Sequence, residues 1–238
     1  MLTRCFMADN AQILAIIPAR KGSKRLPGKN TLSLAGKPLI QWTIEAAQQS
    51  QAVDEVLVTS DDPAVLSLAH QLRVDHVLER PDDLASDTAK SSDVILHALA
   101  YRSRLGNPPG ALCLLQATSP LRTAEDIDGA HALYIQRGAP SVISVCELEH
   151  PLTWCSTLDE DLSMRGFAEK IQQEKNSQYL KKHYRLNGGI YISDTKKFIR
   201  VGSFLDKKTL AYIMPKHRSV DIDDEFDFRL AELIFEKL

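Results

Sequence analysis

Five cations and two glycines lie close together between residues 18 and 30. The segment reads Pro-Ala-Arg-Lys-Gly-Ser-Lys-Arg-Leu-Pro-Gly-Lys-Asn and follows an apolar run at residues 13–17. If that run is a buried strand, the loop leaves its carboxyl end, where ligands bind in open α/β sheets. Glycine lets backbone N–H groups approach an anion, and lysine and arginine neutralise its charge. The pattern predicts a polyphosphate site, and its candidate residues are Arg20, Gly22, Ser23, Lys24, Lys29 and Asn30.

The loop matches neither of two familiar phosphate-binding motifs. Lys29 is followed by Asn30 and the glycine spacing differs, so the segment is not G-x-x-x-x-G-K-[ST]. It also lacks the dinucleotide fingerprint G-x-G-x-x-G. We therefore expect neither a P-loop ATPase nor a standard Rossmann dehydrogenase. On position and composition alone, the alternative is a solvated basic turn.

Two carboxylates alternate near the C-terminus, in the segment Ser-Val-Asp-Ile-Asp at residues 219–223. We predict a short strand here, whose period-two geometry puts Asp221 and Asp223 on one face. Mg²⁺ takes one or two carboxylates together with waters and substrate phosphates, so the pair suits a metal beside a polyphosphate. The alternative is that Asp223 or Asp224 caps the helix that follows while Asp221 is solvated.

The elements that must position these groups follow from hydrophobic patterning. Apolar runs predict buried strands at residues 13–17, 55–59, 74–78, 111–116, 141–145, 188–192 and 210–214. Helical periodicity predicts helices at 38–49, 62–72, 89–104 and 124–137, and a last helix from about 224 that faces the core with Phe226, Leu230, Leu233 and Ile234. The alternation predicts an α/β fold with a mainly parallel sheet and helices on both faces.

The rhythm breaks between residues 147 and 184, which are polar and show no strong period. A chain of 238 residues favours one domain with an elaboration over two domains. We therefore expect a single domain over residues 1–238 with an insertion at about 147–184.

Composition excludes several classes of protein. The net charge of -2 gives no basic field for a nucleic acid, and no apolar run is long enough to span a bilayer. We expect neither a nucleic-acid nor a membrane partner. The first residues lack the apolar core of a signal peptide, and the four cysteines form no C-x-x-C pair, so a cytoplasmic protein with reduced core thiols is expected.

Five strings in series resemble the CMP-sialic acid synthetases, or N-acylneuraminate cytidylyltransferases. They are IPARKGSKRLPGKN, RPDDLASDTA, LLQATSPLRT, YRLNGGIYI and SVDIDDEFDF, and the resemblance spans about residues 13–235. It implies a Rossmann-like cytidylyltransferase domain whose small insertion forms a homodimer. Ala117 stands where many relatives have proline, and RLPGK resembles the neighbouring KDO cytidylyltransferases, which use an eight-carbon acid. Asn30 and RLNGGIYI favour the nine-carbon acids.

The resemblance also assigns roles to residues. Arg80 and Ser91 are expected near the cytosine, and Asp221 and Asp223 are similar to the family's Mg²⁺ site, which Mn²⁺ also suits. Polar residues after the strand at 111–116 and around Gly188 are expected at the sugar, where the planar guanidinium of Arg185 suits the carboxylate. These expected sugar contacts are Gln116, Thr118, Ser119, Arg185 and Asn187. A plain strand-to-helix turn at 116–119 and a bulged sheet edge at 185–189 are the structural alternatives.

The implied reaction joins CTP to a nonulosonic acid of the N-acetylneuraminic type and releases pyrophosphate. The anomeric hydroxyl attacks the α-phosphorus in line, a reaction that depends mostly on positioning and charge neutralisation. Lys29 and Arg20 would balance the triphosphate, and Asp221 is the expected general base. The alternatives are a KDO cytidylyltransferase with the same chemistry and a non-catalytic protein that binds CTP or a CMP-sugar.

Overall fold

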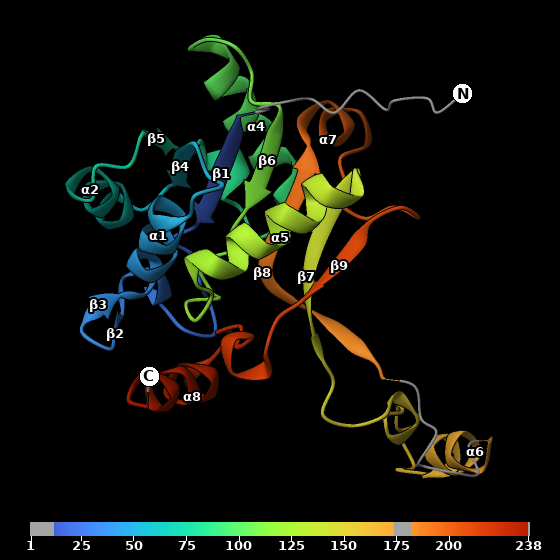
Figure 1. The fold of residues 1–238 in the computed structure, drawn as a ribbon. Helices are drawn as coiled ribbons and strands as arrows, with labels where there is room; N and C mark the ends of the chain where they lie inside the picture. Colours follow the sequence, from blue (N-terminus) through green and yellow to red (C-terminus); the bar gives the residue numbers. More distant parts are fainter. Residues whose placement is uncertain (1–11, 174–181, 238) are drawn as a thin grey trace, which may run out of the picture.

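The computed structural model describes residues 12–173 and 182–237 and contains a seven-stranded sheet (Figure 1). Cys5, the leader segment and the last part of the predicted insertion lie outside the described residues. The strands are β1 (Ile13–Ala19), β4 (Glu55–Ser60), β5 (His76–Glu79), β6 (Ala111–Leu114), β7 (Ser141–Glu147), β8 (Tyr184–Asp194) and β9 (Leu210–Ile213), in the order β5-β4-β1-β6-β8-β7-β9. All seven strands predicted from apolar runs are confirmed.

One strand runs against the rest. β8 pairs antiparallel with both β6 and β7, whereas β1 pairs parallel with β4 and β6, β4 with β5, and β7 with β9. The sheet is therefore mainly parallel, as predicted. The reversal of β8 was not predicted, because an apolar run has no direction in the sequence.

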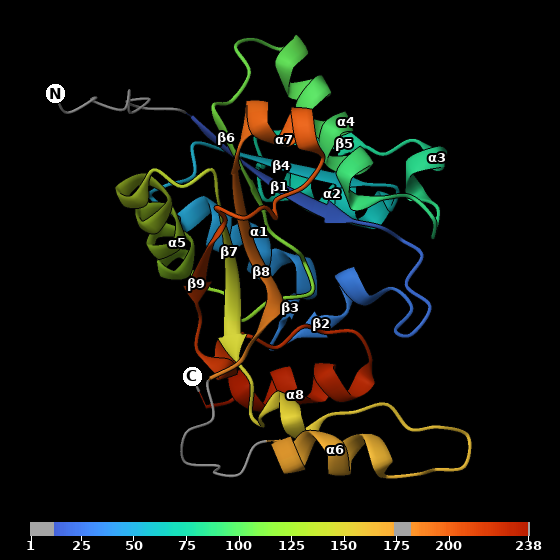
Figure 2. The same ribbon diagram turned by 90° about the vertical axis from the view of Figure 1, so that its right-hand side faces the viewer.

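Helices cover both faces of the sheet (Figure 1, Figure 2). Ile44 of α1 (Leu39–Gln49), Val65 of α2 (Pro63–Gln71) and Ile127 of α5 (Ala124–Arg137) belong to one buried cluster with β1. On the other face, Leu99 of α4 (Ser91–Arg104) and Phe198 of α7 (Thr195–Val201) pack over Leu14 and Ile16. The predicted Rossmann-like α/β class is confirmed.

Several short elements were not predicted. They are the hairpin of β2 (Ser33–Leu34) and β3 (Lys37–Pro38), the helices α3 (Asp82–Ala85), α6 (Arg165–Gln173) and α7, and the 3-10 turns at Lys29–Thr31, Leu152–Trp154 and Lys216–Arg218. Each is shorter than the window over which helical or strand periodicity can be recognised.

The last helix, α8 (Glu225–Phe235), begins as predicted but turns a different face to the core. Its core-facing side chains are Phe228 and Ala231, and Phe235 lies against Trp42 with ring centroids 4.3 Å apart. Phe226 is 76% exposed, and Leu230 and Leu233 also face outward. The predicted stripe was therefore wrong except for Ile234, which packs on the buried cluster. This sequence carries apolar residues on two faces, and periodicity cannot choose between them.

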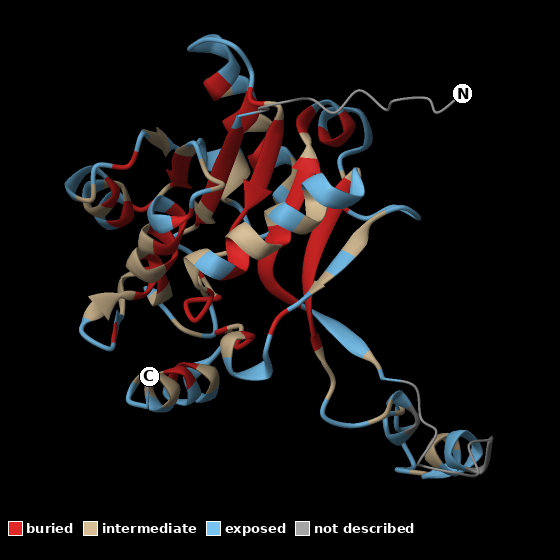
Figure 3. Ribbon diagram, viewed as in Figure 1, coloured by how far each residue is buried: buried red, intermediate tan, exposed pale blue. Residues whose placement is uncertain are grey.

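The insertion leaves the sheet between β7 and β8 and projects away from the core (Figure 1, Figure 2). Its described part holds the turn at Leu152–Trp154 and helix α6, and most of it is exposed (Figure 3). Trp154 is 53% exposed, and Leu162 and Met164 are exposed as well. We call residues 147–184 the arm.

Two further sequence expectations can be compared with the described residues. No helix within residues 12–173 and 182–237 is long and apolar enough to cross a bilayer. Cys113 and Cys146 are buried free thiols, as predicted, and burial raises the pKa of Cys113 to about 12. Cys155 is also free but lies exposed on the arm, so its placement in the core was wrong.

Candidate active site

A cavity of about 680 Å³ opens where β1 and β6 end. The basic loop forms one wall, the segment from Arg80 to Ser91 forms another, and Gln116 to Thr118 and Asp221 to Asp223 complete it. The predicted site residues among its lining are Arg20, Ser23, Lys24, Lys29, Asn30, Arg80, Ser91, Gln116, Thr118, Asp221 and Asp223. Four segments that are far apart in the sequence therefore meet at one edge of the sheet.

The basic loop is held in one shape by backbone and side-chain contacts. Gly28 has a φ of 66°, a left-handed conformation that glycine adopts without strain, and it begins the 3-10 turn that carries Lys29. The buried amide of Asn30 donates a hydrogen bond to the carbonyl of Arg20 at 2.9 Å. The N–H of Lys21 donates to Asp61 at 2.9 Å, which ties the loop to the end of β4. These contacts therefore fix the conformation of the loop that carries the cations.

Lys29 is the most deeply placed cation of the loop, with a side chain 11% exposed. Its Nζ donates to the carbonyl of Ile222 at 2.6 Å and lies 3.8 Å from the Asp223 carboxylate. Burial lowers the pKa of Lys29, and the charges of Asp223 and Asp221 oppose that shift. Arg25, which we did not single out from the sequence, pairs with Asp223 at 3.0 Å.

Asp87 organises the outer cations of the loop. It forms ion pairs with Arg20 and with Lys24, the latter at 2.6 Å, and these hydrogen bonds lower the pKa of Asp87. Asp87 does not cap the next helix, because α4 begins after Lys90 with no side-chain cap. The cavity lining thus holds five cations and three carboxylates, an excess of positive charge that suits an anionic ligand.

Arg80 brings a buried guanidinium to the opposite wall. Its Nη2 donates to the carbonyl of Thr59 at 3.0 Å, and its buried Nε has no partner among the described residues. Burial lowers the pKa of Arg80. A buried donor without a partner is costly, and a ligand acceptor in the cavity would satisfy it. This geometry fits the predicted contact with a base.

Asp221 and Asp223 both face the cavity, on either side of the fully buried Ile222. The alternation was predicted correctly, but the segment is not a strand: it is held to the site by the Ile222 N–H, which donates to the carbonyl of Thr118 at 2.8 Å. Asp224 caps α8, leaving Asp223 free of that role. Burial raises the pKa of Asp221, and a hydrogen bond from Thr118 opposes the shift.

Gly188 brings β8 close to these groups. Its φ is +74°, and a Cβ there would lie 2.6 Å from Oε1 of Gln116 and 3.3 Å from Asp221. Real Cβ atoms do not approach that closely, and an L residue is strained at this φ, so only glycine fits without displacement. The bulge considered from the sequence therefore has a steric purpose: it lets Gln116 and Asp221 share one corner of the cavity.

A second cavity of about 250 Å³ adjoins the first, and both are lined by Ser91 and Gln116. Its remaining wall is mostly apolar and comes from α4, β6, β7, β8, α7 and the loop after α7. These residues include Ile95, Leu114, Ile143, Tyr191, Phe198, Phe204 and Leu205. The site thus has a charged compartment and an apolar compartment that meet at Gln116.

Four predicted residues do not line either cavity. Gly22 is exposed on the loop, and Ser119 and Asn187 are buried beneath the site. The amide of Asn187 is engaged inside the protein, since its Oδ1 accepts from Ser144 at 2.6 Å and its Nδ2 donates to Ser219 at 2.9 Å. Arg185 donates to the carbonyl of Ser219 at 2.9 Å, close to the Asp221 segment. A sugar contact by these residues stays a prediction, and for Ser119 and Asn187 the role visible here is support.

The chemistry of Asp221 and Asp223 suits a divalent cation. Oδ1 of Asp221 is buried and has no hydrogen-bond partner among the described residues, while Asp223 is half exposed beside Lys29 and Arg25. Within that part of the chain, no group of three or more His, Cys, Asp or Glu side chains converges as a metal cage. Two carboxylates fit Mg²⁺, which keeps waters and takes substrate phosphates as its other ligands.

Comparison with known proteins identifies the class to which this fold and cavity belong. A family model described as Cytidylyltransferase matches residues 14–214, and the chain belongs to that family. A solved structure of CMP:2-keto-3-deoxy-manno-octonic acid synthetase complexed with CTP has the same fold, with a TM-score of 0.70 at 17% identity, covering 95% of this chain and all of that one.

The relatives of this chain include a cytidylyltransferase and a synthase, each named for a nonulosonic acid. The N-acylneuraminate cytidylyltransferase of Escherichia coli O18:K1:H7 is 38% identical over 227 residues, which are 95% of this chain but 52% of that protein. The CMP-N,N'-diacetyllegionaminic acid synthase of Legionella pneumophila is 36% identical over 229 residues, 94% of this chain and 97% of that protein. The chain thus spans about half the length of the first relative and nearly all of the second. The predicted resemblance to the CMP-sialic acid synthetase family is confirmed.

Proposed function

We propose that this chain transfers the cytidylyl group of CTP to a nonulosonic acid, giving the CMP-sugar and pyrophosphate. The observation that carries the proposal is the charged cavity, whose lining has more cations than carboxylates and holds Lys29 and Arg25 next to Asp223. Membership of the cytidylyltransferase family and similarity to two enzymes of this kind support it.

The cations of the loop supply the charge that a triphosphate needs. Asp87 forms ion pairs with Arg20 and Lys24, and Asp223 forms one with Arg25. A triphosphate offers these cations more negative charge than the carboxylates do, and charge-assisted hydrogen bonds to phosphate are strong. The carboxylates keep the long side chains extended toward the cavity, so less side-chain entropy is lost when the nucleotide binds.

The opposite wall suits the base. The buried Nε of Arg80 has no partner among the described residues, and Ser91, the first residue of α4, lines the same cavity. Cytosine offers O2 and N3 as acceptors, which a guanidinium, a hydroxyl and backbone donors match. This placement puts the base between β5 and α4 and the phosphates along the basic loop.

Asp221 is the proposed general base for the anomeric hydroxyl. It lies at the corner where the two cavities meet, beside Gln116 and Gly188. A hydroxyl bound there would lie between the apolar compartment and the phosphates, which is the arrangement that in-line attack requires. Lys29 then neutralises negative charge as the α-phosphate reacts and pyrophosphate leaves, because its amine is held at this end of the cavity.

Asp221 and Asp223 would hold Mg²⁺ or Mn²⁺. When bound, such a cation neutralises phosphate charge and helps to orient the leaving group. The buried, unpartnered Oδ1 of Asp221 is the structural observation in favour of this role.

The second cavity supports an acid that carries an acyl group. Aromatic and aliphatic side chains form most of its wall, and Ser91 and Gln116 supply polar groups at its mouth. Burying an N-acyl methyl among such residues makes the free energy of binding more favourable, whereas the hydroxyl groups of KDO would lose hydrogen bonds to water there. We therefore place the nine-carbon acids, namely N-acetylneuraminic, legionaminic or pseudaminic acid, ahead of KDO.

We also propose that the protein is located in the cytoplasm.

The arm is the proposed dimer contact. Trp154, Leu162 and Met164 are each exposed, and the segment that carries them projects from the core (Figure 3). Large apolar side chains on such a segment are typical anchors of an interface.

Pyrophosphate release tests the proposal directly. The purified chain is incubated with CTP, Mg²⁺ and each of the four acids, with GTP and UTP as nucleotide controls. We expect CTP-dependent release with at least one nine-carbon acid and slower release with KDO. A protein that binds CTP but releases no pyrophosphate with any acid would instead be a nucleotide-binding protein.

A further inference from the structure

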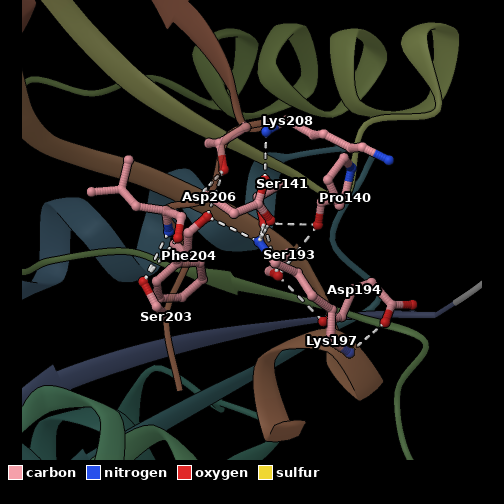
Figure 4. Close-up of polar contacts among 11 residues, drawn as sticks. Pro140, Ser141, Ser193, Asp194, Lys197, Ser203, Phe204, Asp206 and Lys208 are labelled. Atoms are coloured by element: carbon pink, nitrogen blue, oxygen red, sulfur yellow. Dashed lines mark hydrogen bonds and ion pairs between the residues drawn. The ribbon is translucent and has the colours of Figure 1, made fainter. Parts of the chain in front are cut away.

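Lys197 of α7 is a cation buried behind the apolar compartment. Its side chain is 8% exposed, and its Nζ donates to Ser141 Oγ at 2.6 Å, to the carbonyl of Phe204 at 3.1 Å and to Asp206 at 2.7 Å (Figure 4). An ammonium group has three hydrogens, so these three acceptors use all of its donors. Lys197 lines neither cavity and has no part in the proposed chemistry.

The contacts of Lys197 converge on one loop, residues 202–209, which joins α7 to β9. Thr209 Oγ1 donates to the same Phe204 carbonyl at 2.9 Å, and the Asp206 N–H donates to Thr209 Oγ1 at 2.8 Å. The loop is thus tied to itself through Thr209 and to the sheet through Lys197 and Ser141. Without Lys197, the carbonyl of Phe204 and the carboxylate of Asp206 lose their tie to the sheet.

The loop also forms part of the wall of the apolar compartment. Ser203, Phe204 and Leu205 line that cavity, and the ring of Phe204 packs against Tyr191 and Phe198 with centroid distances of 5.4 and 4.7 Å. The backbone atom that Lys197 holds therefore belongs to a residue whose side chain shapes the wall. Buried ion pairs are weak contributors to stability, and fixing one conformation is their better supported use.

We propose that Lys197 is a positioning residue that sets the shape of the sugar compartment by holding the loop through Phe204 and Asp206. The inference rests on the proposed function, because it takes the apolar compartment as the place where the acid's substituents bind. Ser141 is fully buried in β7 and pairs with Ser193 of β8, so the bond network anchors the cavity wall to the sheet. Lys197 thereby contributes to the affinity for the acid without touching it.

Lys197→Met tests this, with Arg102→Met as the matched control. Methionine keeps an unbranched apolar stem and removes the ammonium. Arg102 is similarly buried, 10% exposed, and pairs with Glu55 at 2.8 Å, but it lines neither cavity. Comparing Lys197→Met with Arg102→Met separates the general effect of losing a buried ion pair from the specific effect of losing the contacts of Lys197. Thermal unfolding of both variants shows whether they are destabilised to a similar degree.

We expect Lys197→Met to raise the KM for the acid about 10-fold while the KM for CTP stays within about twofold. Arg102→Met should leave both KM values near those of the wild type. Amide hydrogen exchange over residues 202–209 should be faster in Lys197→Met only. If Lys197→Met does not fold, Asp206→Asn removes the charge of the partner alone and should show a smaller rise in the same KM.

Three results overturn the inference, and each is distinct from the others. An active wild type, with an acid KM and loop exchange that are unchanged in Lys197→Met and Asp206→Asn, shows that Lys197 does not position the wall. Equal rises in the KM for the acid and for CTP, matched by Arg102→Met, show a general loss of stability. A wild type that releases no pyrophosphate with any acid refutes the proposed function itself, and the sugar role of Lys197 falls with it.

Discussion

Replacing Lys29 with alanine should lower kcat far more than it lowers the affinity for CTP. The amine is mostly buried and lies 3.8 Å from a carboxylate of the proposed metal site. At such separations, a pair of unit charges near a protein surface interacts by about 4 kcal/mol. Loss of one preorganised donor to a developing anion typically costs about 2.7–4 kcal/mol, so we expect kcat to fall by roughly 10² to 10³.

The assay is continuous pyrophosphate release at saturating CTP and acid, with folding checked by circular dichroism. Lys24→Ala is the matched control, because Lys24 belongs to the same loop but its side chain is 80% exposed. Solvent and salt screen such a charge, so its kcat should stay within about fivefold of the wild type. If folded Lys29→Ala keeps more than about a third of the wild-type kcat, or if Lys24→Ala is affected as strongly, the reasoning from burial is refuted.

Four further predictions concern other parts of the molecule. Asp223→Asn keeps its shape but loses the charge that Mg²⁺ prefers, so the apparent metal requirement in a Mg²⁺ titration should rise with a smaller change in acid KM; an unchanged titration contradicts this. Arg185→Ala should raise the acid KM about 10-fold or more and leave CTP affinity unchanged. A weaker CTP affinity with an unchanged acid KM would show that the sugar does not bind at Arg185. Light scattering at micromolar concentration should give a dimer held through residues 147–184, and a monomer would rule that out. The hydrogen bond with Arg102 lowers the pKa of Glu55 in the folded protein. The ionised Glu55 therefore stabilises the fold above about pH 4.3, the pKa of glutamate in the unfolded chain, and this stabilisation is lost as the pH falls through the lower pKa of the folded state. The free energy of unfolding of Glu55→Gln should depend less steeply on pH below about 4.3 than that of the wild type.

Much of the fold could be predicted because buried parallel strands are apolar throughout. Residues 13–17 and 56–58 are continuous apolar runs, and the structure puts them side by side in β1 and β4. The direction of β8 and the buried face of α8 depend on tertiary contacts instead. Phe226 and Phe228 are equally apolar in the sequence, and packing in the cluster with Leu34, Leu39 and Ile222 is what buries Phe228.

The site could be predicted where its residues follow strands, as Arg20, Lys29 and Gln116 do. Asp87 and Arg25 were missed because their partners are distant in the sequence: Asp87 pairs with Arg20, and Arg25 pairs with Asp223. A polar residue that precedes a helix, such as Asp87, can be explained locally as a helix cap. That local explanation gives no reason to expect a long-range ion pair such as the one with Arg20. The apolar compartment was missed for the same reason, since six elements contribute to it.

Because β8 runs against its neighbours, it leads directly from the arm to the candidate active site. The parallel strands reach the site at their last residues, whereas β8 reaches it near its beginning, where Gly188 passes beside Gln116. The chain therefore runs from the arm into the site along one strand, from Tyr184 to Gly188, without an intervening loop. Between Tyr184 and Leu186 this strand pairs with β7 alone, and its pairing with β6 begins at Tyr191. The proposed dimer contact and the candidate active site are therefore joined by one continuous strand.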